Sequence, residues 1–229
     1  MIILSIETSG TSCSAALICK ESVLASRYTD SSQNHSASLP VYIDELLTLA
    51  RNKAWHIDAI AVSEGPGSYT GLRIGVSTAK GLAYGMNIPL VGVNTLQLLA
   101  AIAQQKIKEE NIWFCPMIDA RRMEVYTCLY NNLLQPQTEV QAMVLDSQSL
   151  DTVLSQHPLC IIGSGAHKCS TIITHPNAIY LPDIEPDAKY MYSLAEDKML
   201  AGQKADIAYF EPFYLKEFQA APSHIKGLV

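Results

Sequence analysis

The hydrophobic positions in the first half of the chain form short runs that are separated by turn-forming residues. Residues 2–6, 14–18 and 23–28 are apolar runs of strand length, and a turn rich in Thr, Ser and Gly separates the first two. This pattern predicts a meander of three strands. Two later apolar runs, at 59–63 and 90–93, predict two further strands.

Three segments of the first half carry the pattern of helices. Residues 38–51 place apolar side chains at every third or fourth position, with Pro40 near the start, where a helix tolerates proline. Residues 72–84 are mostly apolar or small, and residues 95–105 form the third segment. The predicted order is therefore three strands followed by alternating helices and strands.

The second half repeats this order, which predicts a duplicated βββαβα unit. Each half opens with a strand that ends in an acid, Glu7 in the first and Asp119 in the second. A turn and two more predicted strands follow each acid. The predicted strands of the second half are 113–118, 123–130, 139–145 and 159–162, and its helices are 149–155 and 191–201.

Length and composition favour one body made of two lobes. The chain has 229 residues, of which 48% are hydrophobic, and this is enough to bury a substantial core. No linker rich in Pro, Gly or Ser separates the halves. We therefore expect residues 1–106 and 107–229 to form two lobes that pack against each other.

Charge and cysteine usage restrict the classes of function. The net charge is −6 and no basic cluster extends beyond Arg121-Arg122, so a role on RNA requires a partner that supplies positive charge. The six cysteines form no C-x-x-C pair, and we expect them to be reduced. No apolar run approaches the roughly 20 residues needed to cross a bilayer, and the start of the chain lacks signal-peptide features, which favours the cytoplasm.

The stretch from Gly65 to Gly75 lies between a predicted strand and a predicted helix. A glycine loop at the start of a helix either holds an anion with backbone N–H groups or makes a turn too tight for side chains. The helix that follows repeats Gly71, Gly75, Ala79 and Ala83 at intervals of four, a ridge almost without side chains. Such a ridge admits close approach by a neighbouring helix, either that of residues 38–51 or one from a partner.

Five motifs in order resemble those of a known family. The order of elements resembles the actin-like ATPase domain shared by sugar kinases, acetate kinase and chaperone ATPases, which implies a two-lobe α/β fold of the ASKHA, ribonuclease H-like type. A closer resemblance, over nearly the whole chain, is to the TsaB family, a bacterial subunit of the machinery that makes threonylcarbamoyladenosine on tRNA. The motifs that carry it are residues 6–9, 65–75, 92–96, 119–126 and 211–216.

This resemblance implies a non-catalytic subunit. The family's catalytic paralogue, TsaD, holds a metal through two histidines four positions apart on the helix that follows a Val-Asn pair. Here Val93-Asn94 is present, but the two positions carry Thr95 and Leu99, and neither is a ligand of any strength. We expect no metal, no cofactor and no catalytic residue.

Two segments are candidates for contact with an anion. The turn at residues 8–12 matches the first phosphate loop of actin-like ATPases, although an ordinary hydroxyl-rich turn has the same composition. The second loop carries Arg121 and Arg122 where such enzymes favour glycine, so a nucleotide would be held from one side only. These arginines either meet an anion, such as RNA held by a complex, or form a solvated charge pair. The vestigial phosphate loop comprises Thr8, Ser9, Gly10, Thr11 and Ser12.

The resemblance also implies a partner surface. In the TsaB family the two helices after the first strands pair with TsaD, or with a second copy when TsaD is absent, and we expect the same here. The candidate interface residues are Leu39, Tyr42, Ile43, Leu46, Gly71, Leu72, Gly75, Val76, Ala79 and Ala83.

The expected function is that of an accessory subunit that dimerises with TsaD and activates it for threonylcarbamoyl transfer to the adenosine next to the anticodon. The ATPase TsaE joins the larger complex in this family, and tRNA is contacted only through the complex. The alternative is a phosphotransferase or ATPase that acts alone through the turn at residues 8–12. Binding and turnover of ATP by the chain alone would favour the alternative.

Overall fold

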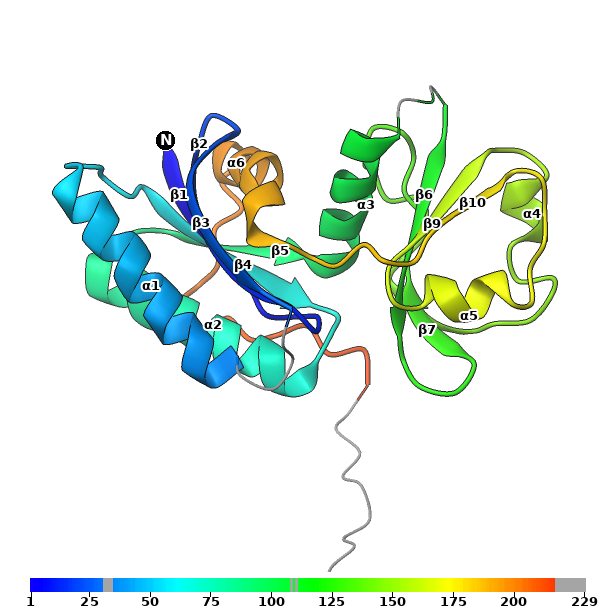
Figure 1. The fold of residues 1–229 in the computed structure, drawn as a ribbon, viewed down its shortest axis with the longest axis horizontal. Coiled ribbons are helices and arrows are strands. Elements are labelled where there is room, and N and C mark those ends of the chain that lie inside the picture. The colour runs from blue at the N-terminus through cyan, green and yellow to red at the C-terminus, as the bar shows by residue number, and fades with distance from the viewer. Residues whose placement is uncertain (31–34, 108, 110, 217–229) are drawn as a thin grey trace, which may run out of the picture.

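Two lobes, each built on a five-stranded mixed sheet, make up the computed structural model of the chain, which describes residues 1–30, 35–107, 109 and 111–216 (Figure 1). In the first sheet β1 pairs antiparallel with β2 and parallel with β4, which gives the order β3-β2-β1-β4-β5. The strands are β1 (Ile2–Glu7), β2 (Cys13–Cys19), β3 (Ser22–Thr29), β4 (Ala59–Gly65) and β5 (Leu90–Asn94).

The second sheet has the same topology. Its first strand, β6, pairs antiparallel with β7 and parallel with β9, and the full order is β10-β9-β6-β7-β8. The two sheets thus repeat one arrangement of five strands, which confirms the predicted two-lobe fold. The strands are β6 (Trp113–Asp119), β7 (Glu124–Thr127), β8 (Gln141–Val144), β9 (Leu159–Ile162) and β10 (Ala178–Leu181).

Two long helices lie side by side on one face of the first sheet (Figure 1). Helix α1 (His35–Asn52) packs on β2, and α2 (Tyr69–Met86) packs on β4. Strand β1 shows the two-residue period that this packing requires, because Leu4 and Ile6 join the core under α1 and α2 while Ile3 joins the core on the other face.

Both helices are longer than the hydrophobic pattern indicates. Helix α1 begins at His35, and α2 begins at Tyr69 because the Ser68 side chain accepts a hydrogen bond from the Gly71 backbone N–H at 3.3 Å. Asn87, in a left-handed conformation, ends α2. Polar capping residues fix both ends of α2, so apolar periodicity alone misses them.

Helix α3 (Thr95–Lys106) lies between the lobes, in the middle of Figure 1. It packs on β4 and β5 of the first sheet and on β6 and β9 of the second. The remaining helices are short: α4 (Asp151–Leu154), α5 (Ala166–Ser170), a 3-10 turn η1 (Ala188–Tyr190) and α6 (Tyr192–Leu200).

The last described part of the chain returns to the first lobe. The turn η1 contacts β1 and β2, and α6 contacts β5, although the order of elements places both in the second half. Further along, the Ala205 backbone N–H donates to the Leu90 carbonyl at 2.8 Å. The last described segment of the second half thus packs on the first sheet. The predicted division of the chain between residues 106 and 107 stays a prediction.

Candidate functional site

Four of the five sequence motifs, all but that at residues 92–96, supply residues to a cleft between the lobes. The cleft has a volume of about 1140 Å³. Its walls come from the turn after β1, the loop before α2, the turn between β6 and β7, and the last described residues of the chain. The segments that supply cleft residues are 9–11, 66–70, 118–124 and 213–216, together with single residues such as His35 and Glu185.

A buried carboxylate supports the turn after β1. Glu7 accepts hydrogen bonds at 2.5 Å from both the backbone N–H and the hydroxyl of Ser9, and a third from the Ser63 hydroxyl. Burial raises the pKa of Glu7 to about 7, although these hydrogen bonds oppose the shift. Glu7 lies below the cleft surface, where it holds the turn and β4 together.

The turn at residues 8–12 forms part of the cleft wall, but most of its hydroxyl groups donate hydrogen bonds within the chain. Thr8 donates to the Gly71 carbonyl at 2.7 Å, Ser9 donates to Glu7, and Ser12 donates to the Pro186 carbonyl at 2.9 Å. All three donors are buried. Of the four hydroxyls in the turn, only that of Thr11 is exposed.

An acidic side chain also lies beside this turn. A Cβ atom placed on Gly10 would lie 2.7 Å from Oε2 of Glu185, a residue of the cleft wall. A carboxylate in this position repels a phosphate. The turn after β1 therefore connects β4, α2 and the segment at Pro186. Its remaining polar groups are poorly suited to binding a triphosphate.

The predicted arginine pair lies at the tip of the β6–β7 turn, on the opposite wall of the cleft. Arg121 and Arg122 have φ angles of 71° and 48°, a left-handed conformation that residues other than glycine seldom adopt. Asp119 stabilises the turn by accepting the Arg121 backbone N–H at 2.6 Å. Both arginines are exposed and line the cleft, and whether they contact an anion stays a prediction.

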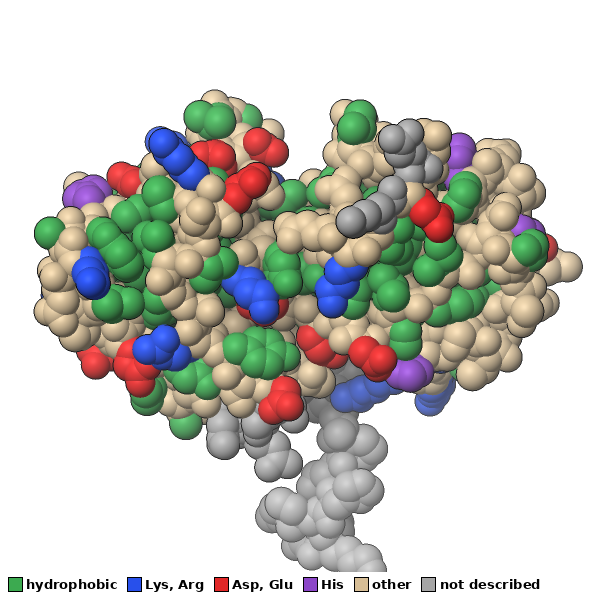
Figure 2. Space-filling model, turned by 45° about the horizontal axis from the view of Figure 1, so that its top comes forward, with side chains coloured by type: hydrophobic (Ala, Val, Ile, Leu, Met, Phe, Trp, Pro, Cys, Tyr) green, Lys and Arg blue, Asp and Glu red, His purple; other side chains and the backbone are tan. Residues whose placement is uncertain are grey.

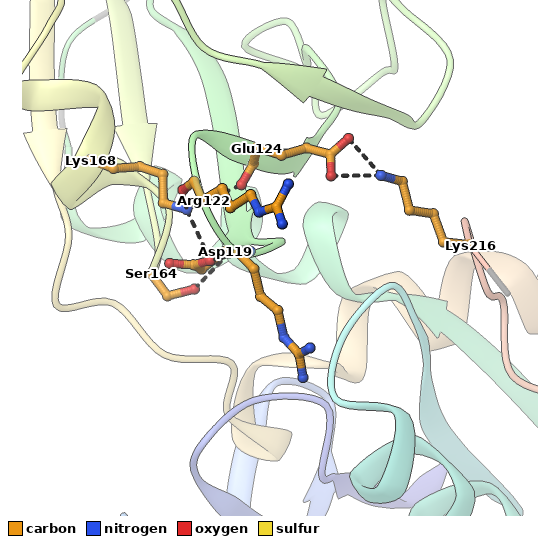
Figure 3. A network of polar contacts seen from close by, with 7 residues as sticks. Asp119, Arg122, Glu124, Ser164, Lys168 and Lys216 are labelled. Atoms are coloured by element: carbon orange, nitrogen blue, oxygen red, sulfur yellow. Dashed lines mark hydrogen bonds and ion pairs between the residues drawn. The ribbon is translucent and has the colours of Figure 1, made fainter. Parts of the chain in front are cut away.

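Lys168 stabilises the β6–β7 turn (Figure 3). The Lys168 Nζ atom lies 2.9 Å from Asp119 Oδ1 and donates to the backbone carbonyls of Arg122 and Glu124 at 2.6 and 3.2 Å. Ser164 accepts the Asp119 backbone N–H at 3.1 Å. Ser164 and Lys168, which follow β9, thus stabilise the left-handed conformation of this turn.

The small-residue ridge of α2 faces the sheet of its own lobe. A Cβ atom on Gly71 would lie 2.0 Å from the Thr8 carbonyl oxygen, and one on Gly75 would lie 2.3 Å from the Thr8 hydroxyl. The turn after β1 packs so closely on α2 that only small residues fit at Gly71 and Gly75. The ridge contacts its own chain at Gly71 and Gly75, and the approach of a partner helix stays a prediction.

Most of the other predicted interface residues are also in the core of the first lobe. Tyr42 is partly exposed, and the other nine predicted residues are buried. An interface on this face of the lobe has to use other residues of α1 and α2. The buried nine are Leu39, Ile43, Leu46, Gly71, Leu72, Gly75, Val76, Ala79 and Ala83.

Thr95 and Leu99, which occupy the positions of the metal-binding histidines in the resemblance, are buried on α3. The Asn94 side chain caps this helix by accepting the backbone N–H groups of Leu96 and Gln97 at 2.9 and 3.2 Å. Among the described residues, no group of three or more His, Cys, Asp or Glu side chains is arranged to hold a metal ion.

The sequence did not indicate that the motif at residues 211–216 completes the cleft. The Phe213 backbone N–H donates to the Glu64 carbonyl at 2.6 Å, directly before the glycine loop. Lys216 then pairs with Glu124 on β7 of the other lobe, at 2.6 Å (Figure 3). The only signal of this role was the motif itself, because no periodicity marks an extended segment without regular structure.

Acidic, basic and apolar side chains of the described residues are intermixed on the face drawn in Figure 2, and no large basic patch gathers there. Within the described ranges, no helix combines the length and the apolar character that crossing a membrane requires.

Two lobes built on one repeated arrangement of five strands, with a cleft between them, define an actin-like ATPase fold. A family model described as "TsaD: tRNA N6-adenosine threonylcarbamoyltransferase" matches residues 28–210, which is more than half of the chain. The chain belongs to this family.

Curated relatives named TsaB match most of the chain. The tRNA threonylcarbamoyladenosine biosynthesis protein TsaB of Escherichia coli is 29% identical over 227 residues, which cover 94% of this chain and 95% of that protein. TsaB of Bacillus subtilis is 37% identical over 148 residues, and this match spans 63% of each chain. A tRNA N6-adenosine threonylcarbamoyltransferase of Geotalea daltonii is 42% identical over 79 residues, 34% of this chain and 23% of that protein.

Solved structures show the same fold. A structure of YeaZ from Pseudomonas aeruginosa superposes with a TM-score of 0.79 at 25% identity and covers 93% of this chain and 99% of that one. A second structure from the same organism, described as similar to peptidase YeaZ, has a TM-score of 0.81 at 24% identity, with 94% and 99% covered.

Proposed function

We propose that this chain is an accessory, non-catalytic subunit of the cytoplasmic machinery that makes threonylcarbamoyladenosine on tRNA. In this role it dimerises with a TsaD partner and activates it for transfer to the adenosine next to the anticodon. The observation that carries the proposal is the match to relatives named tRNA threonylcarbamoyladenosine biosynthesis protein TsaB over 94% of the chain. The core position of Thr95 and Leu99 supports a non-catalytic role, because neither residue can serve as a metal ligand there.

The proposal includes the family's wider assembly. The ATPase TsaE joins the larger complex, a homodimer forms when TsaD is absent, and tRNA is contacted only through the complex. The intermixed charges of the face drawn in Figure 2 and the net charge of −6 support this last point, since stable binding to a polyanion requires clustered positive charge.

The partner surface is the outer face of α1 and α2. Since the predicted ridge is internal, the residues available for contact are the exposed apolar side chains of these helices, Val41 on α1 and Tyr84 and Met86 near the end of α2. Tyr84 is 80% exposed, and an exposed aromatic side chain is a frequent anchor of protein interfaces. Gly81 and Gly85 lie beside it with open space in front of them.

Replacing Tyr84 with Glu tests this surface. We expect Tyr84→Glu to weaken the affinity for the cognate TsaD by about tenfold or more, because it removes an aromatic anchor and buries a charge. Affinity is measured by titration of purified TsaD. The matched control is Leu133→Glu in the second lobe, where the replaced side chain is 68% exposed. Equal affinity of Tyr84→Glu and Leu133→Glu for TsaD would refute the proposal that this surface binds TsaD. Failure of the unmodified chain to bind TsaD would refute the proposed function itself.

The alternative of an ATPase that acts alone is less favoured. The buried, occupied hydroxyls of Thr8, Ser9 and Ser12 and the carboxylate of Glu185 are poorly suited to phosphate. Micromolar binding of ATP with magnesium by the isolated chain, followed by turnover, would reverse this preference.

A further inference from the structure

The motif at residues 211–216, here called the C-terminal strap, is fixed to the first lobe by several contacts. The Phe213 backbone N–H donates to the Glu64 carbonyl at 2.6 Å. The Tyr214 ring lies 4.9 Å from the Tyr69 ring between centroids, and its hydroxyl is 3.3 Å from Arg73 Nε. The strap therefore lies against the glycine loop and the first turn of α2.

The strap then reaches the second lobe. Lys216 Nζ lies 2.7 and 2.6 Å from the two carboxylate oxygens of Glu124, the first residue of β7 (Figure 3). Both Lys216 and Glu124 line the cleft. The ion pair thus joins a segment anchored on one lobe to a strand of the other.

Glu124 is well placed to bear such a contact. Its backbone carbonyl accepts hydrogen bonds from the Ala120 backbone N–H and from Lys168, so its position in the second lobe is fixed. Its side chain is 22% exposed and that of Lys216 is 48% exposed. Partial exclusion from water makes this pair stronger than a fully solvated one.

We propose that the C-terminal strap is a clasp that sets the width of the cleft between the lobes. The chain itself connects the lobes on both sides of the second sheet, through the segment after α3 and the segment before η1. The strap adds a third, non-covalent connection along the cleft. When Lys216 and Glu124 separate, the lobes rotate apart and the cleft opens.

Charge reversal tests the clasp. Spin labels are placed on the outer surfaces of the lobes by Thr48→Cys on α1 and Ser170→Cys on α5, in a Cys19→Ser background. The five other cysteines are buried and do not compete for the label. Distances between the labels are measured by pulsed electron–electron double resonance at low salt.

We expect Lys216→Glu and Glu124→Lys each to raise the population of longer distances by about two- to fivefold. Combining both substitutions restores an ion pair and returns the original distribution. The matched control is Arg27→Glu, which makes the same change of charge but breaks the Arg27–Glu45 pair within the first lobe, and it leaves the distances unchanged. Unchanged distances in both single variants, in folded protein, would overturn the proposal, and so would a combined variant that stays open.

Discussion

Glu7, which lies beneath the cleft, is a fully buried carboxyl at the end of a central strand. Burial raises its pKa to about 7 in the folded chain, above the value of 4.5 for an exposed glutamate. The folded state therefore binds the proton more tightly than the unfolded state. The contribution of Glu7 to the free energy of unfolding is therefore fully present below pH 4.5, and it is lost as the pH rises through 7.

Replacing Glu7 with Gln should remove this dependence. Between pH 4.5 and pH 8 the free energy of unfolding of the unmodified chain should fall relative to that of Glu7→Gln by about 3 kcal/mol, since each pKa unit corresponds to about 1.4 kcal/mol. Urea unfolding at the two pH values measures the difference. Asp44→Asn, at an exposed position on α1, removes the same charge and serves as the control. Parallel pH profiles for Glu7→Gln and the unmodified chain would contradict this assignment.

At the scale of elements, α2 combines two kinds of glycine. Gly75 faces Thr8, whereas a Cβ atom on Gly81 would meet nothing within 4 Å. Both lie within one helix, so alanine brings the same gain in helix propensity at each position. The difference between the two substitutions therefore isolates the packing of α2 on its own sheet.

We expect Gly81→Ala to stabilise the chain by about 0.5–1 kcal/mol. Gly75→Ala should destabilise it by about 1–3 kcal/mol, because the added methyl group would lie 2.3 Å from the Thr8 hydroxyl. Chemical denaturation gives both values. A Gly75→Ala variant as stable as Gly81→Ala would mean that the ridge has free space in front of it, as the original prediction of a partner helix requires.

The same helix shows what the sequence could and could not provide. Its apolar period correctly predicted a helix after β4, and the run from Ala59 correctly predicted a buried strand before it. Periodicity identifies a face with small side chains, but it does not identify the neighbour, and here the neighbour of Gly71 and Gly75 is Thr8. The sequence could not separate the two interpretations of the ridge, because a closely packed internal face and a bare external one have the same pattern.

For the cleft, the sequence identified motifs that supply its walls, but not their internal contacts. The turn after β1 and the arginine turn, both singled out as candidates for contact with an anion, line the same cleft. Which hydroxyls are already bonded depends on partners more than 60 positions away, such as Gly71 for Thr8 and Pro186 for Ser12. No local pattern carries that information.

For the whole molecule, the two lobes share one hydrophobic cluster, beside one further cluster in each lobe. A single hydrophobic cluster includes Ile3 and Val91 of the first sheet, Leu99 of α3, Phe114 of the second sheet and Leu194 of α6. This cluster contains side chains from both sides of the predicted division at residues 106 and 107, so separating the halves would expose apolar surface.

We therefore expect the chain to unfold as one unit. Differential scanning calorimetry should show a single transition whose calorimetric and van't Hoff enthalpies agree. Cavity-forming Leu99→Ala in α3 should lower the transition temperature without splitting the peak. Two resolved transitions, one for each lobe, would show that the shared cluster does not couple them.

The packing of η1 and α6 on the first sheet has a consequence for synthesis. As the protein is made from its first residue onward, β1 to β5 are complete well before η1, α6 and the C-terminal strap exist. During that interval the face of the sheet that α6 will cover, including Val91 and Val93, is open to water. The lobe that is begun first is finished last, so the nascent chain passes through a stage in which it presents an uncovered apolar sheet to other molecules in the cell.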